Sequence, residues 1–251
     1  MKQLFFLILL ASANVLLAAD NPQLVFRSPE SRATLLELYT SEGCSSCPPA
    51  EAWLSKVKSS PALWREFVPV AFHVDYWDYL GWRDPWAKPE FTARQHAYAQ
   101  AWCANNVYTP GFVLNGKEWR NWGGGAEKLN TATTKPGVLE LSSADTNRWQ
   151  VRFTPVVKSA ARLEACVALL GSGLVSDVKA GENRGRKLAH DFVVLSLARV
   201  AMTQKDGVWQ GEAALPSGAA KTQGSFAVAA WVLAERGLEP VQAVGGWLKA
   251  P

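Results

Sequence analysis

The chain is poor in the residues that most often cross-link proteins or bind metals. Its 251 residues include only four cysteines, three histidines and two methionines. Four cysteines are too few to hold a chain of this length together by disulfides, so a hydrophobic core must supply most of the stability. The content of 48% hydrophobic residues, with twelve tryptophans, is typical of a well-packed globular protein. The length allows one large domain or two small ones.

The chain also lacks clusters of basic residues. Its formal net charge is +4 at pH 7, and no block of lysine and arginine stands out. So mild an excess of positive charge does not indicate a nucleic-acid partner, and we expect none.

Long hydrophobic runs are missing everywhere except at the N-terminus. Lys2 precedes the apolar run 4–10, and small residues follow, which is the layout of a secretory signal peptide. We predict that residues 1–19 are this peptide, that the mature protein is periplasmic or secreted, and that it has no stable membrane insertion. Cleavage after Ala13 and an uncleaved membrane anchor are the alternatives. Losing Lys2 lowers the net charge from +4 to +3.

Hydrophobic patterning divides the mature chain into two parts. Residues 20–135 show strands and helices in alternation: strands at 34–39, 67–75 and 111–115, helices at 44–58 and 89–104, and a helix-like stretch ending near Thr133. Residues 136–251 show mainly short strands between turns, at 149–157, 162–170, 193–202, 208–214 and 225–234. We therefore predict an α/β domain followed by a mostly β, sandwich-like C-terminal domain.

The most specific chemical motif is the pair Cys44 and Cys47, which follows a predicted buried strand and opens a predicted helix. The free amides and partial positive charge of a helix N-terminus favour the thiolate form at Cys44. Cys44 is expected to project from the helix end, and Cys47 to lie close enough to displace a mixed disulfide. A stable structural disulfide between the two is the alternative.

A second motif, Thr109-Pro110, stands just before the predicted strand at 111–115. A cis proline at this place would face the two cysteines and leave the backbone of Thr109 free to pair with a bound peptide. Tyr108 precedes it and is a candidate for substrate binding. A trans proline that begins a strand is the alternative.

The chain resembles an uncharacterised family of exported, thioredoxin-like bacterial proteins, a domain of unknown function. The resemblance depends on the segments CSSCP at 44–48, HVDYWD at 73–78, YTP at 108–110 and GEN at 181–183. It implies a thioredoxin-like first domain and a redox role in Gram-negative bacteria. Unlike well-studied thioredoxins, the chain has no tryptophan directly before its first cysteine, so the resemblance implies neither a redox potential nor a partner.

Three further residues are candidates for the site. Glu37 lies in the strand before the cysteines, where thioredoxins carry a buried acid, and a buried carboxyl could act as a general base. A solvated Glu37 at the sheet edge is equally compatible with the pattern. Tyr76 and Trp77 begin an aromatic-rich segment, 75–88, that could line a groove for a peptide, although packing is the commoner role of such residues.

These observations favour a thiol–disulfide oxidoreductase that needs no organic cofactor and acts on protein thiols and disulfides of the periplasm. One alternative is copper binding or delivery through Cys44, Cys47 and His73, since thiolate and imidazole suit copper. Another is a binding module without catalysis. Cys103 and Cys166 could bridge the two domains or stay free, and residues 182–186 are expected to form a polar turn.

Overall fold

The computed structural model describes residues 24–123, 129, 134–143, 145, 147–157, 161–215 and 224–249. The predicted signal peptide lies outside these residues, as does most of the helix-like stretch expected to end near Thr133. Within the described part of the chain, none of the helices has the length and apolar character needed to cross a membrane.

Strands outnumber helices in both halves of the chain. The first half forms β1 (Leu24–Arg27), β2 (Thr34–Thr40), α1 (Pro48–Lys56), β3 (Phe67–His73), α2 (Pro89–Ala101), β4 (Gly111–Leu114) and β5 (Lys117–Glu118), with short 3-10 turns at Val57–Ser59 and Asp78–Leu80. The second half forms β6 (Gly137–Ser143), β7 (Arg148–Pro155), β8 (Leu163–Ser172), β9 (Leu174–Asp177), β10 (Lys187–His190), β11 (Val193–Ala201), β12 (Thr203–Lys205), β13 (Val208–Ala214), β14 (Ser225–Ala234) and β15 (Pro240–Trp247).

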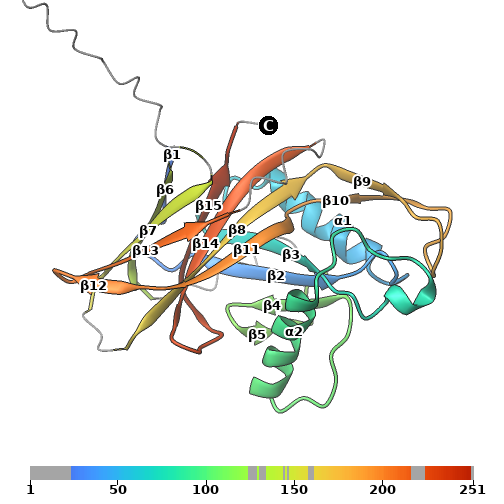
Figure 1. Ribbon diagram of the computed structural model, residues 1–251, viewed down its shortest axis with the longest axis horizontal. Helices are drawn as coiled ribbons and strands as arrows, with labels where there is room; N and C mark the ends of the chain where they lie inside the picture. Colours follow the sequence, from blue (N-terminus) through green and yellow to red (C-terminus); the bar gives the residue numbers. More distant parts are fainter. Residues whose placement is uncertain are drawn as a thin grey trace, which may run out of the picture.

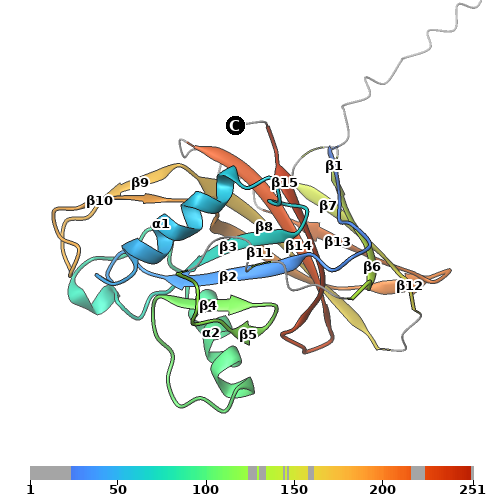
Figure 2. The same cartoon turned by 180° about the vertical axis from the view of Figure 1, so that it is seen from behind.

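An eight-stranded sheet runs through the molecule in the order β15-β14-β8-β11-β3-β2-β4-β5 (Figure 1). Strand β3 is parallel to β2 on one side and to β11 on the other, and the remaining pairs are antiparallel. A second, five-stranded sheet has the order β1-β6-β7-β13-β12. It lies at the end of the molecule opposite the hairpin of β9 and β10 (Figure 2).

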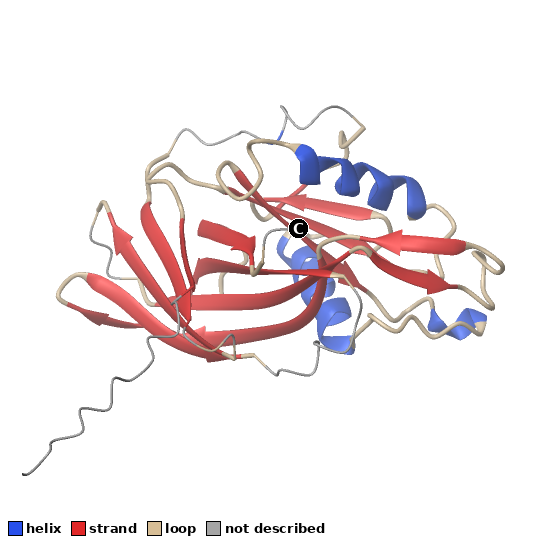
Figure 3. Ribbon diagram, turned by 90° about the horizontal axis from the view of Figure 1, so that it is seen from above, coloured by secondary structure: helices blue, strands red, loops and turns tan. Residues whose placement is uncertain are grey.

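The predicted fold class, an α/β thioredoxin-like domain followed by a mostly β, sandwich-like domain, is wrong. The described residues contain fifteen strands and two α-helices, so the protein is mostly β (Figure 3). In addition, β3 pairs with β11 where Ala71 lies beside Val193, so a single sheet contains strands from both sides of position 135. Strand and helix periodicity reports local structure only, and it could not show that β3 pairs with a strand so much later in the chain.

Alternating side chains give the eight-stranded sheet two buried faces. The face toward α2 carries a cluster that includes Tyr39, Phe72, Phe91, Tyr98 and Trp231. The opposite face carries a cluster under α1, with Leu36, Leu38, Leu54, Phe67 and Phe112, and a cluster under the five-stranded sheet, with Leu141, Trp149, Val151, Val167 and Val232. Burying one such side chain stabilises the fold by about 1.5–3 kcal/mol, so burial on both faces holds the helices and the second sheet in place.

The buried amide of Gln242 joins the two ends of the described chain. Its Oε1 accepts the backbone N–H of Ala33 at 2.8 Å, and its Nε2 donates to the carbonyls of Pro29 and Ser31 at 3.1 Å and of Gly137 at 2.8 Å. Gln242 is fully buried, so one side chain of β15 satisfies backbone groups of the segment before β2 and of β6.

Candidate functional site

Two sulfur atoms meet at the N-terminus of α1. The loop after β2 leads to Cys44, and Cys47 occupies the N-cap position of the helix, with prolines in its first turn where their missing amides cost little. The thiol of Cys47 donates a hydrogen bond to Cys44 Sγ over 2.6 Å. The helix predicted at 44–58 is observed at Pro48–Lys56, so Cys47 is its N-cap and Cys44 lies in the loop before it.

The two thiols differ in acidity. The hydrogen bond from Cys47 is the largest influence on Cys44 and, with help from Ser46 and Thr109, it lowers the pKa of Cys44 to about 6 against an opposing effect of burial. Ser46 Oγ lies 3.2 Å from Cys44 Sγ. Burial raises the pKa of Cys47 far above its usual range. Cys44 therefore ionises first, and Cys47 keeps its proton.

The expected redox-active disulfide is not formed in this structure, in which the four cysteines Cys44, Cys47, Cys103 and Cys166 are all free. The sulfur atoms of Cys44 and Cys47 lie 2.6 Å apart with no bond between them. A Cys103–Cys166 bridge is also absent, because Cys103 is exposed after α2 and Cys166 is buried within β8.

Cys44 is covered, contrary to the expectation that it would project from the helix end. It is 1% exposed, while Ser45 and Ser46 beside it are exposed. Trp77 holds the residues on either side of Cys44: its Nε1 donates to Thr109 Oγ1 at 2.7 Å, and its Cβ packs on Gly43. A Cβ at Gly43 would lie only 2.8 Å from Trp77 Cβ, so the absence of a side chain there allows this packing.

The segment between β9 and β10 holds the cysteine loop from a second side. Asn183 Nδ2 donates to the carbonyl of Glu42 at 2.8 Å and to that of Cys44 at 2.9 Å. The carboxylate of Glu182 accepts the backbone N–H of Ser45 at 2.9 Å. Asn183 is fully buried, so residues 182–186 are more than the expected polar turn. The role of Glu182 and Asn183 in holding the cysteine loop was not predicted from the sequence. A polar segment with glycines is typical of a turn, and its composition does not show which distant residues it contacts.

The predicted turn at Thr109-Pro110 lies beside the dithiol, and its peptide bond is cis. The carbonyl of Thr109 is 3.7 Å from Cys44 Sγ. On the outer side of the turn a groove of about 330 Å³ is lined by Tyr108, Pro110, Phe112, Trp119, Arg120 and Trp122. Tyr108 is 44% exposed, and its hydroxyl donates to Glu118 at 2.6 Å. An aromatic, accessible surface is thus continuous with the turn.

Tyr76 lies under the same turn. Burial is the main cause that raises the pKa of Tyr76 well above its usual range, and Thr109 is among its hydrogen-bonding neighbours. Its hydroxyl also donates to Gln95 Oε1 at 3.2 Å, and Gln95 Nε2 donates to the carbonyl of Tyr108 at 2.7 Å. Tyr76 and Trp77 therefore pack beneath the residues around Pro110. Of the three residues predicted to bind substrate, Tyr108 is the one that lines the groove.

Glu37 lies on the other face of β2. It is fully buried, and its carboxylate accepts hydrogen bonds from Arg94 Nε at 2.8 Å, Arg94 Nη2 at 2.9 Å and the hydroxyls of Tyr39 and Tyr98. Side chains alternate along a strand, so Glu37 and Thr40 point to opposite faces. Glu37 is therefore held in a buried ion pair on the α2 face, away from the α1 face that carries the dithiol.

The buried acid on the dithiol side of β2 is Glu51, which sequence reasoning missed. Glu51 follows Cys47 by four positions in α1, which places the two side chains on one helix face. The hydroxyl of Thr40 donates to Glu51 Oε1 at 2.5 Å and is also a hydrogen-bonding neighbour of Cys47. The spacing of four positions between Cys47 and Glu51 could have predicted that Glu51 lies near the cysteines.

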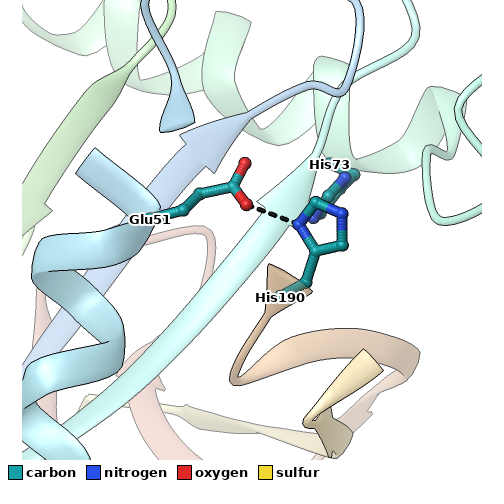
Figure 4. Close-up of side chains that lie close together, drawn as sticks. All are labelled: Glu51, His73 and His190. Carbon is teal, nitrogen blue, oxygen red and sulfur yellow. Dashed lines mark hydrogen bonds and ion pairs between the residues drawn. The ribbon is translucent and has the colours of Figure 1, made fainter. Parts of the chain in front are cut away.

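Glu51 belongs to a buried polar cluster with His73 and His190 (Figure 4). His190 Nδ1 contacts Glu51 Oε2, and its Nε2 lies 3.0 Å from Glu42 Oε1. Burial opposes the positive charge of His190, but these two carboxylates raise its pKa to about 10. His73, which the copper hypothesis grouped with the thiols, is instead paired with Asp84 and clustered with Glu51 and His190.

These features define a mostly β protein with a covered dithiol at the start of its first helix. The chain belongs to the family described as protein of unknown function (DUF1223), which matches residues 35–232. This assignment places it in an uncharacterised family, as the sequence motifs indicated.

Two solved structures are similar to the chain over most of its length. Protein AGR_C_4864 from Agrobacterium tumefaciens is 25% identical, with a TM-score of 0.59, and the match covers 87% of this chain and 94% of that one. HBP35 of Porphyromonas gingivalis is 14% identical, with a TM-score of 0.57, over 86% of this chain and 75% of that one. The likeness to HBP35 concerns the fold alone. Comparison with curated proteins gave no match.

Proposed function

We propose that this protein exchanges thiols and disulfides through Cys44 and Cys47. The observation that carries the proposal is the pair of sulfur atoms 2.6 Å apart at a helix N-terminus, and the hydrogen bond between them favours the thiolate form of Cys44 by lowering its pKa. A thiol with a pKa of about 6 is mostly ionised at neutral pH, and the thiolate is the nucleophile in disulfide exchange.

In the reductive direction, the Cys44 thiolate attacks one sulfur of a substrate disulfide. A bond forms between Cys44 Sγ and that sulfur, and the other substrate sulfur leaves as a thiolate. Cys47 then releases its proton and its sulfur attacks Cys44 Sγ, which expels the second substrate sulfur. The substrate gains two electrons, one proton from Cys47 and one from solvent, while Cys44 and Cys47 become a disulfide. Oxidation of a substrate dithiol is the reverse reaction.

The surroundings of the dithiol support a protein substrate. The groove of about 330 Å³ beside Pro110 presents Tyr108, Trp119 and Trp122 next to the turn that contacts Cys44. Aromatic grooves bind extended peptide segments through large contact areas. Because Cys44 is 1% exposed, a protein disulfide reaches it only after a local opening of the residues around it. We place the reaction in the periplasm, where protein disulfides persist.

Trapping of the mixed disulfide tests the proposal. All variants carry Cys103→Ser, because Cys103 is exposed and would react on its own. Reduced protein is mixed with oxidised glutathione or with a cell-envelope extract, and disulfide-linked products are identified by mass spectrometry. We expect Cys47→Ser to accumulate a mixed disulfide at Cys44, because the sulfur that would displace the partner is missing. The protein with both cysteines intact should instead end as a Cys44–Cys47 disulfide.

Cys44→Ser is the matched control, and it should form no trapped product. The proposal fails if Cys47→Ser reacts at Cys44 no faster than at the buried Cys166, or if the intact pair stays reduced in the presence of oxidised glutathione. The copper and binding-module alternatives stay predictions, since the described contacts favour neither.

A further inference from the structure

Both buried histidines lie against carboxylates, His73 through one ring nitrogen and His190 through both, since His190 Nδ1 also contacts Glu51. His73 Nδ1 lies 2.7 Å from Asp84 Oδ2, and His190 Nε2 lies 3.0 Å from Glu42 Oε1. Both histidines are only 1% exposed. Histidines that bind metals are commonly oriented in this way, with the nitrogen that does not bind the metal donating to a carboxylate.

His190 Nδ1 contacts the Glu51 carboxylate, and the ring of His73 lies beside that pair (Figure 4). The ring centroids of His73 and His190 are 5.1 Å apart, with the planes at 81°. One ligand atom from each of His73, His190 and Glu51 lies within 4.8 Å of the other two. Among the residues that the structure describes, His73 Nε2 has no hydrogen-bond partner although it is buried. An unpaired buried nitrogen is costly, and a ligand at this point would satisfy it.

The charges around this point favour a cation. Three buried carboxylates, from Glu42, Glu51 and Asp84, surround the two imidazoles. Apart from the histidines, the groups that donate to these carboxylates are uncharged: the Thr40 hydroxyl to Glu51, the Trp82 indole to Glu42 at 2.6 Å, and two backbone amides to Asp84 at 2.8 and 2.9 Å. A divalent cation would offset the excess of negative charge in a place that excludes water.

We propose that Glu51, His73 and His190 form a binding site for a divalent first-row metal ion of the Zn²⁺ type. Two imidazole nitrogens and one carboxylate oxygen are a ligand set that such ions accept, with a fourth position left for water or another ligand. Asp84 and Glu42 orient the two histidines. On binding, the contact between His190 and Glu51 opens, His190 Nδ1 loses its proton, and the three atoms close to bond lengths of about 2.0–2.2 Å.

The metal site is separate from the dithiol chemistry. Thr40 lies between the two, as its hydroxyl reaches both Glu51 and Cys47. The site uses no thiolate, unlike the copper hypothesis from the sequence, so it should persist when the cysteines are replaced. Its test and the test of thiol exchange can therefore fail independently.

Zn²⁺ binding is measured by equilibrium dialysis on mature protein that carries Cys44→Ser, Cys47→Ser and Cys103→Ser. We expect one equivalent of bound Zn²⁺ in this thiol-poor background. Asp84→Asn should lower the affinity about 10–100-fold, and His73→Asn, which removes a ligand, at least as much. Co²⁺ provides a second readout, with visible bands of nitrogen and oxygen coordination and no thiolate charge-transfer band.

His96→Asn is the matched control, because His96 is exposed on α2 and should not affect binding. Circular dichroism establishes that each variant is folded. If His73→Asn does not fold, Glu51→Gln, which keeps the shape of the side chain, replaces it. Zn²⁺ should also raise the Tm of the background protein and of His96→Asn, but not that of the ligand variants. The proposal is overturned if the background retains no Zn²⁺ or if the ligand variants bind it as tightly as His96→Asn.

Discussion

At the scale of single residues, the two cysteines have opposite environments despite their separation of only two positions in the chain. Cys44 Sγ accepts a hydrogen bond from Cys47 and lies 3.2 Å from Ser46 Oγ, whereas Cys47 is fully buried and is the donor in the bond between the two sulfur atoms. The acidity of Cys44 therefore depends on Cys47 more than on any other group.

Removing the Cys47 thiol should make Cys44 less acidic. In the parent the pKa of Cys44 is about 6, so its thiolate fraction should rise with pH through 6 and level off above about pH 7. In Cys47→Ala the main stabilising hydrogen bond is lost, and the pKa should move up toward about 8.5. Thiolate ultraviolet absorbance, recorded against pH in a Cys103→Ser background, measures both midpoints without requiring access to the sulfur.

Glu37→Gln is the control for this titration. Glu37 pairs with Arg94 on the opposite face of β2, so its replacement should leave the Cys44 midpoint in place. A parent midpoint near that of a free thiol, or equal midpoints in the parent and Cys47→Ala, would contradict the assignment of the hydrogen bond.

At the scale of elements, the segment between β9 and β10 acts on the dithiol from outside the helix that carries it. Asn183 and Cys44 are 139 positions apart in the chain, yet the Asn183 side chain donates to the Cys44 carbonyl. The same side chain donates to the carbonyl of Glu42, so it fixes both ends of the loop that leads to Cys44.

Asn183→Ala should loosen this loop. The change leaves the carbonyls of Glu42 and Cys44 without their donor, and we expect a stability loss of about 1–3 kcal/mol. Cys44 should then react several-fold faster with iodoacetamide at pH 7, because its cover opens more often. Arg184→Ala, at an exposed neighbouring position, should change neither quantity. Equal alkylation rates in the two variants would show that Asn183 does not control access.

Most of the elements around the site were predictable from periodicity and from local turn chemistry. The helix predicted at 89–104 is observed at Pro89–Ala101, and the strand predicted at 67–75 is observed at Phe67–His73. Asn115 and Gly116 both have positive φ, as expected of a two-residue hairpin turn. These features depend on neighbours in the chain, which a sequence displays directly.

The contacts that complete the site were not predictable in the same way. Asn183 and His190 reach the site from strands and turns far along the chain, and nothing in their local sequence distinguishes them from ordinary polar residues. Glu37 was proposed as a base because it precedes the cysteines, but whether it faces α1 or α2 depends on strand register. A shift of one residue in register exchanges the two faces, so proximity in sequence was a poor guide.

At the scale of the whole molecule, the two halves of the chain share one sheet and one core cluster. Trp231 of β14 is fully buried in the cluster that also contains Tyr98 of α2 and Phe72 of β3. The guanidinium of Arg94 lies 5.4 Å from the centre of the Trp231 ring. Stability in the first half should therefore depend on side chains of the second.

Trp231→Ala tests this coupling in the full-length protein. We expect a loss of about 3–5 kcal/mol in the free energy of unfolding, measured with urea, because a large buried side chain is removed. Native-state hydrogen exchange should show the slowest amides of β2 and β3 losing as much protection as those of β8. Tyr79→Ala, at a residue that is 77% exposed, should change little. Protection lost in β8 but kept in β2 and β3 would show that the halves unfold separately.

The hydrogen bonds made by the buried Gln242 side chain have a consequence for how the protein folds. Strand β15, which carries Gln242, is the last of the described strands, and the Gln242 amide satisfies backbone groups at Pro29, Ser31, Ala33 and Gly137. Until β15 has joined the eight-stranded sheet, those buried groups lack their partner, so the segment before β2 and the start of β6 gain their full stability only when this late part of the chain has folded.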